Sequence, residues 1–89
     1  MAVFYVRSTD GNNADNGSTW ALADATLAGS IAGTLAAGDT VYVSDAHAES
    51  TAGAVTLNWP GTAASPNKVI CGDDVAEPPT AVTTTGTVT

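Results

Sequence analysis

Short β-strand signals return along this chain at nearly constant spacing. Fourteen residues separate Val41 from Val55 and Val55 from Val69, and thirteen separate Val69 from Val82. Each position opens a short β-type run: Val41-Tyr42-Val43, Val55-Thr56-Leu57, Val69-Ile70-Cys71 and Val82-Thr83-Thr84. Even recurrence of this kind is typical of solenoids, whose coils stack along one axis. Taken two strands at a time, the period is 28 or 27 residues. The sequence therefore predicts a parallel β-helix with Val41 and Val69 at equivalent levels.

The same repeat predicts which side chains face the interior. Because successive side chains of a strand point to opposite sides, we expect Val41 and Val43 to point inward, with Val69 and Cys71 above them. Cys71, the only cysteine, is then a small apolar residue rather than a redox or metal group. Turn-forming residues separate the strands. They are Ala52-Gly53, Pro60-Gly61, Ser65-Pro66-Asn67, Gly72-Asp73-Asp74 and Pro78-Pro79.

The first part of the chain is predicted to close the base of this stack. A strand over Val3–Val6 precedes a polar loop over 8–17, whose Asp-Gly and Asn-Gly pairs favour turns. A helix is expected from Trp20 to Leu35, with Gly38 just past its end. It should lie on the bottom edge of the first coil, where unpaired backbone groups would otherwise invite aggregation. Its apolar face comprises Trp20, Ala23, Leu27, Ile31 and Leu35.

We therefore expect a single module over 1–89, with the strand, loop and capping helix in 1–38 and the first coils in 39–89. Residues 80–89 are strand-type Thr and Val sequence without the polar closing element that a solenoid needs at its end. We expect these coils to be incomplete, so that a continuation of the chain or a second chain covers the last strand. The residues expected at such an interface are Trp59, Val82, Thr84 and Val88.

The charge balance limits the possible partners. Arg7 and Lys68 are the only Lys or Arg residues, and the formal net charge is −7. A chain this acidic repels phosphate groups, so we expect neither nucleic acid nor an anionic membrane surface as a partner. No apolar stretch reaches the ~20 residues that cross a bilayer, and the first four residues lack the basic region of a signal peptide. We expect synthesis in a host cytoplasm without secretion.

The polar loop contains candidate metal ligands. Asp10, Asn12 and Asp15, together with Asn16, offer the oxygen atoms that Ca²⁺ prefers. Their spacing departs from that of an EF-hand loop, and the distal Glu of such a loop is missing. A solvated turn is therefore the favoured interpretation, and the three residues stay as weak metal candidates.

A second polar group follows the Val41–Val43 strand. Asp45, His47 and Glu49 alternate along the chain and could converge as an acid–base or metal group. A polar outer face is favoured, because one His with two carboxylates lacks the third nitrogen or sulfur ligand expected of zinc. No serine lies in a nucleophile elbow, and the adjacent Asp73 and Asp74 point apart, so they cannot form a glycosidase pair. We predict no catalytic residue and no cofactor.

The two tryptophans could stack sugar rings. Trp20 falls on the apolar stripe of the expected helix, whereas Trp59 precedes Pro60 at the end of a strand. Trp59 is therefore the better candidate for an exposed contact, although packing is the favoured role for both side chains.

Four stretches between Phe4 and Asp74 share a family resemblance. They are Tyr5-Val6; the loop ending in Asp15-Asn16-Gly17-Ser18, with Trp20 and Ala25-Thr26-Leu27; Gly38-Asp39-Thr40-Val41-Tyr42-Val43; and the segment from Gly61 to Gly72. Together they resemble the N-terminal cap and first coil of right-handed parallel β-helix proteins of the pectate-lyase-like superfamily. The resemblance implies a mainly β fold with one N-terminal capping helix.

The resemblance implies less about activity, because the same cap precedes lyases, hydrolases, adhesins and phage structural proteins. In the enzymes of that superfamily the catalytic residues normally lie on later coils. The prediction is a non-catalytic structural protein of a tailed-phage virion, either a capsid decoration or a tail-associated component. Its partners would be other virion proteins and further copies of itself, a trimer being frequent in such families. The alternatives are the cap of a polysaccharide lyase or glycosidase, and an adhesin that binds a surface glycan through Trp59.

Overall fold

The computed structural model describes residues 2–32, 35–49, 57–79, 82 and 87–88, and within this part the protein is mostly β with one α-helix. The elements follow in the order β1 (Val3–Val6), a 3₁₀ helix η1 (Trp20–Leu22), α1 (Leu27–Ala32), β2 (Thr40–Ser44), β3 (Ala48–Glu49), β4 (Lys68–Gly72) and β5 (Thr87–Val88).

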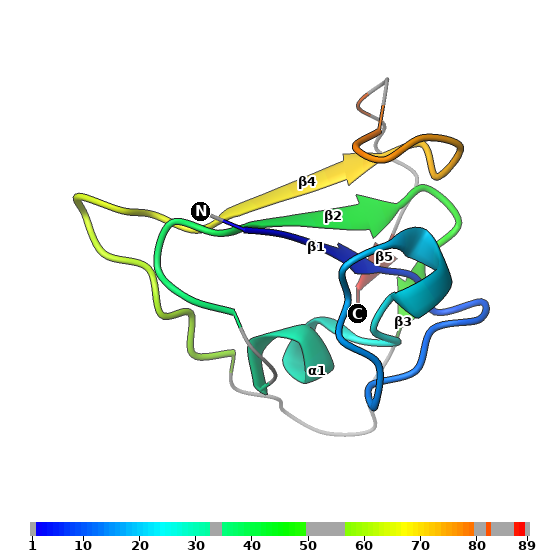
Figure 1. Ribbon diagram of the computed structural model, residues 1–89, viewed down its shortest axis with the longest axis horizontal. Helices are drawn as coiled ribbons and strands as arrows, with labels where there is room; N and C mark the ends of the chain where they lie inside the picture. The colour runs from blue at the N-terminus through cyan, green and yellow to red at the C-terminus, as the bar shows by residue number, and fades with distance from the viewer. Residues whose placement is uncertain (1, 33–34, 50–56, 80–81, 83–86, 89) are drawn as a thin grey trace.

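Three strands form a parallel sheet in the order β1-β2-β4, and their arrows run in the same direction in Figure 1. Val41 pairs with Phe4 on one side and with Val69 on the other, while Val43 pairs with Val6 and Cys71. The predicted pairing of Val41 with Val69, 28 positions apart, is therefore confirmed. Residues at the same level point to the same side, so the sheet consists of ladders of equivalent side chains.

One face of the sheet carries the main apolar core. Phe4 and Val6 of β1 and Val41 and Val43 of β2 are buried there, and Val41 is fully enclosed. Leu27 at the start of α1 packs on this face, and the other contributors come from α1 itself, from the chain just after it and from the loop before β4. They are Ile31, Leu35, Leu57 and Trp59. Of the expected inward positions, Val41 and Val43 fill the core, whereas Val69 is 47% exposed and Cys71 is half-buried.

The opposite face carries an aromatic cluster. Tyr5 stacks on Tyr42 of the next strand with ring centroids 5.8 Å apart, and Trp20 tilts against Tyr5 at 4.7 Å. The Arg7 guanidinium lies 5.4 Å from the centre of the Trp20 ring. Trp20, which the sequence had placed on the apolar stripe of a helix with Leu27, therefore covers this face with Arg7.

The prediction of a single helix from Trp20 to Leu35 is wrong. The segment forms η1, then an extended stretch, then the six-residue helix α1. Trp20 packs on Tyr5, whereas Leu27 packs on the other face with Phe4 and Val6. The chain must therefore pass around the edge of β1 between these two contacts. A continuous helix could not bring Trp20 to one face of the sheet and Leu27 to the other.

The outer edge of β1 is closed by this extended stretch rather than by the helix. Tyr5 N donates to Gly17 O at 2.8 Å, Asp24 N donates to Tyr5 O at 3.0 Å, and Arg7 N donates to Asp24 O at 2.9 Å. Gly17 has a φ of 72°, and a Cβ there would lie 2.9 Å from Asp24 Oδ2, so this close approach requires glycine. The edge of β1 is therefore closed by backbone pairing and not by the expected helix.

Residues 73–79 fold back over the aromatic cluster. Trp20 Nε1 donates to Ala76 O at 2.8 Å, and Trp20 N donates to the Glu77 carboxylate. Asp74 Oδ2 accepts from Ser44 Oγ at 2.8 Å and from Arg7 Nη1 at 3.3 Å. The segment after β4 is thus held by contacts to three earlier parts of the chain.

A second pairing joins β3 to β5 in parallel, with Ala48 opposite Thr87 and Glu49 opposite Val88. Val82 makes an isolated antiparallel bridge to Gly72, at the end of β4. The other residues of two expected strands, namely 55, 56, 83 and 84, lie outside the described residues.

Candidate functional site

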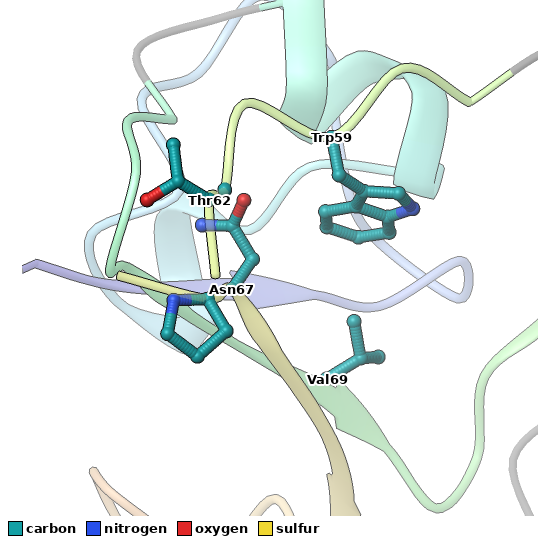
Figure 2. A pocket seen from close by; sticks show the side chains of 6 residues that line it. Trp59, Thr62, Asn67 and Val69 are labelled. Atoms are coloured by element: carbon teal, nitrogen blue, oxygen red, sulfur yellow. The ribbon is translucent and has the colours of Figure 1, made fainter. Parts of the chain in front are cut away.

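A cavity of about 320 Å³ opens beside β4 on the core face of the sheet. Its walls are Trp59, Gly61, Thr62, Pro66, Asn67 and Val69. Figure 2 shows the Val69 side chain pointing toward the indole of Trp59, with Thr62 and Asn67 on the other side. One half of the cavity is therefore apolar and the other carries an amide and a hydroxyl group.

The apolar half is a continuation of the core. Trp59 is half-buried and packs against the main apolar cluster. Val69 occupies the level next to Val41 but is 47% exposed, whereas Val41 is 0% exposed. Val41 has β4 beside it, whereas among the described residues no further strand lies beside Val69. The cavity lies at this uncovered position.

The polar half is rigidly built. Asn67 Nδ2 donates to Ala36 O at 2.8 Å and to Asp39 O at 3.2 Å, which fixes the amide beside β2. Thr62 and Ser65 close a tight turn through reciprocal backbone hydrogen bonds of 3.1 and 3.2 Å. A Cβ on Gly61 would lie 2.6 Å from Asn67 N, so the turn can approach β4 only with glycine at that position.

Asp39, whose carbonyl accepts from Asn67, also stabilises the chain around the polar half of the cavity. Its carboxylate accepts from Ala2 N at 2.7 Å and from Ala36 N at 2.8 Å. These backbone hydrogen bonds lower the pKa of Asp39, with a smaller contribution from the nearby N-terminal amine. Asp39 thereby ties the start of β1 and the chain after α1 to the start of β2.

The cavity can provide contacts but not acid–base chemistry, because none of its six lining residues titrates near neutral pH. Its apolar wall suits an aliphatic side chain from another strand or the face of a sugar ring. Trp59, the predicted interface residue, lies in this site. Thr62 and Asn67 were not predicted, because their sequence context indicates only a turn.

The other predicted interface residues lie elsewhere. Val82 is 77% exposed near the end of β4, at its bridge to Gly72. Val88 lies in β5, and Thr84 lies outside the described residues.

The candidate metal ligands of the polar loop are not gathered around one point. Asp10 forms an ion pair with Arg7, with Oδ1 2.8 Å from Nε, and Asn12 Oδ1 accepts from Ala14 N at 2.9 Å. Asp15 lines a different cavity, described below. Within the described part of the chain, no group of three or more His, Cys, Asp or Glu side chains is placed to hold a metal ion.

His47 differs from the expected polar outer face. It is only 1% exposed, in a turn where its N–H donates to Ser44 O at 3.0 Å. Asp45 is half-buried in the same turn, and its N–H donates to Gly72 O at 2.9 Å. Glu49 lies in β3 opposite Val88. His47 therefore contributes to the packing at the end of β2.

Comparison of the chain with protein-family models, curated proteins and solved structures gave no match. Among the described residues, no helix has both the length and the apolar character needed to cross a membrane.

Proposed function

We propose that this chain is a non-catalytic structural module that begins a right-handed parallel β-helix and acts by assembly within a phage virion. The observation that carries the proposal is the register of β2 and β4, which places Val41 beside Val69 and Val43 beside Cys71 after 28 residues. One full turn of the chain between strands at successive levels is the defining geometry of a β-solenoid. The virion setting rests on the family resemblance.

The proposal assigns a role to the Val69 level. A solenoid buries its core by stacking each coil on the next, so Val69 and Trp59 form the surface on which the following layer packs. That layer is either a further coil or the corresponding surface of another copy of the chain, as in a trimer. The apolar half of the cavity then receives an aliphatic side chain, and other virion proteins are bound by the assembled particle.

The experiment compares two single substitutions that add the same charge. Val69→Lys places an ammonium group at the open level of the core, whereas Val75→Lys changes a residue that is 84% exposed in the 73–79 segment. We expect the wild-type chain and the Val75→Lys variant to associate as concentration rises, measured by size exclusion with light scattering. Val69→Lys should remain monomeric because burying an unpaired charge is costly.

Two results would overturn the proposal. One is a wild-type chain that stays monomeric over the full concentration range; the other is equal association of the Val69→Lys and Val75→Lys variants. Release of reducing sugars from polysaccharides by the purified chain would contradict the non-catalytic part separately.

A second function, glycan binding, is favoured by one observation: Trp59 shares its cavity with the Asn67 amide and the Thr62 hydroxyl. An aromatic face beside hydrogen-bonding groups is the usual composition of a sugar site. Glycan-array binding that is lost on Trp59→Ala and retained by Val75→Lys would support this function. Absence of binding by the wild-type chain would exclude it.

A further inference from the structure

A second cavity lies between the polar loop, β1 and α1. Its volume is about 290 Å³, and its walls are the 13–16 loop, Phe4, Asp24 and Ser30. Two carboxylates, those of Asp15 and Asp24, therefore open into one space whose floor includes an aromatic ring. Neither the sequence pattern nor the proposed assembly role accounts for this arrangement.

Asp24 is held in place by its backbone. Its N–H and carbonyl bond to Tyr5 and Arg7 at the edge of β1, and the whole residue is only 4% exposed. Burial raises the pKa of Asp24, and the Asp15 carboxylate raises it further, while the Ser30 hydroxyl lowers it. A buried carboxylate that faces a like charge is an arrangement that a cation relieves.

Ser30 gives an independent indication. It is 2% exposed and lines the same cavity from α1. Its hydroxyl lies near enough to Asp24 to affect that group's pKa, yet it makes no hydrogen bond of normal geometry to any described residue. Buried hydroxyl groups normally have a partner, so a buried hydroxyl group without one, in a residue that lines a cavity with two Asp residues, indicates a missing ligand.

Neither Arg7 nor Lys68 lines this cavity. Arg7 is bound to Asp10 and Asp74, and Lys68 is exposed on β4, at the far end of the sheet order from β1. The loop amides are also engaged, because Asn13 Oδ1 accepts from Ala25 N and Asn16 Oδ1 accepts from Ser18 N. The remaining side-chain oxygen atoms of the lining are the carboxylates of Asp15 and Asp24 and the Ser30 hydroxyl.

We propose that this cavity binds a hydrated divalent cation, with Ca²⁺ as the best-matched ion, through Asp15, Asp24 and Ser30. Ca²⁺ takes six to eight oxygen ligands in flexible geometry, and water can complete the shell. A volume of 290 Å³ accommodates the ion with several waters at about 30 Å³ each. With two carboxylates, the affinity should be in the weak range of roughly 10⁻⁴–10⁻³ M. Binding would join the polar loop to α1 and to the edge of β1.

The test is calorimetric titration of CaCl₂ into the wild-type chain and two variants that lose the same single charge. Asp24→Asn removes a proposed ligand, whereas Asp10→Asn removes the exposed partner of Arg7 and leaves the cavity intact. Because a chain of net charge −7 attracts cations non-specifically, the equal charge change controls for that effect. We expect Asp24→Asn to weaken Ca²⁺ binding by about tenfold or more, and Asp10→Asn to leave it nearly unchanged.

Thermal unfolding provides a second readout, because a ligand that binds only the folded state raises the unfolding temperature. CaCl₂ should raise that temperature for the wild-type and Asp10→Asn chains more than NaCl of equal ionic strength does, and Asp24→Asn should lose the difference. Asp15→Asn, in a less buried position, serves if Asp24→Asn fails to fold. The proposal is overturned by absence of heat and shift in the wild-type chain, or by equal losses in the Asp10 and Asp24 variants.

Discussion

Replacing Val41 and Val69 by Ala, one at a time, tests whether the third strand leaves an open level in the core. The two residues have the same side chain and pair with each other, but Val41 is 0% exposed and Val69 is 47% exposed. Each substitution removes two methyl groups, so any difference in the free energy of unfolding reports the surroundings of the two positions.

The expected magnitudes follow from burial. At ~0.8 kcal/mol for each buried carbon, the Val41→Ala variant loses about 1.6 kcal/mol of transfer free energy. The enclosed site cannot be filled by water, so a cavity of roughly 50 Å³ adds about 1 kcal/mol. At Val69 about half of the transfer free energy is lost, or ~0.8 kcal/mol, and water can occupy the space. Val41→Ala should therefore be less stable than Val69→Ala by about 2 kcal/mol.

The measurement is urea unfolding followed by tryptophan fluorescence and far-UV circular dichroism, at concentrations where the chain is monomeric. The slope of the free energy with urea should be unchanged, because neither substitution alters the surface exposed on unfolding by much. Equal losses at the two positions, or a larger loss at Val69, would refute the assignment of Val41 to a closed level and Val69 to an open one. At concentrations where the chain associates, the loss of unfolding free energy in Val69→Ala should approach that in Val41→Ala.

Two further predictions concern the contacts that hold the ends of the sheet. Trp20→Phe keeps an aromatic ring but removes the N–H that donates to Ala76 O, so urea unfolding should show a loss of about 1 kcal/mol; an unchanged midpoint would show that this bond contributes nothing. Asp39 has a folded-state pKa below its ordinary value of 3.8 because of hydrogen bonds from Ala2 and Ala36, so its carboxylate stabilises the fold above that pH and stops doing so as pH falls through the folded-state pKa. Unfolding curves of the wild type and Asp39→Asn should therefore converge in strong acid, and a gap independent of pH would contradict this.

The parallel sheet could be predicted because its information is local and repeated. Val41-Tyr42-Val43 and Val69-Ile70-Cys71 are β-type runs with the same alternation, and their spacing gives their register. The helix prediction failed because periodicity does not show which side of a neighbouring strand each residue meets. Trp20 and Leu27 share a helical stripe on paper but pack on opposite faces of β1, so tertiary contacts outweighed local preference.

The candidate sites were less predictable. Trp59 could be selected because a tryptophan before proline at a strand end is unusual, but Asn67 reaches the cavity through bonds to Ala36 and Asp39 that no local pattern predicts. The proximity of Asp24 and Ser30 could not be predicted either. The two residues lie in different parts of the chain and line one cavity only because the chain passes around β1. Asp15 was predicted as an oxygen ligand together with Asp10 and Asn12, whereas in the structure it lines a cavity with Asp24 and Ser30.

The backbone bonds from Gly17 and Asp24 to β1 make the two ends of the sheet unequal. A stack with both edges available can elongate without limit, since every added copy offers a fresh edge to the next. Here the starting edge is already occupied, so identical copies cannot join head to tail into a fibre through strand pairing. Under the proposed assembly role, growth would be restricted to one direction, and contact between the remaining edges would yield a particle of finite size.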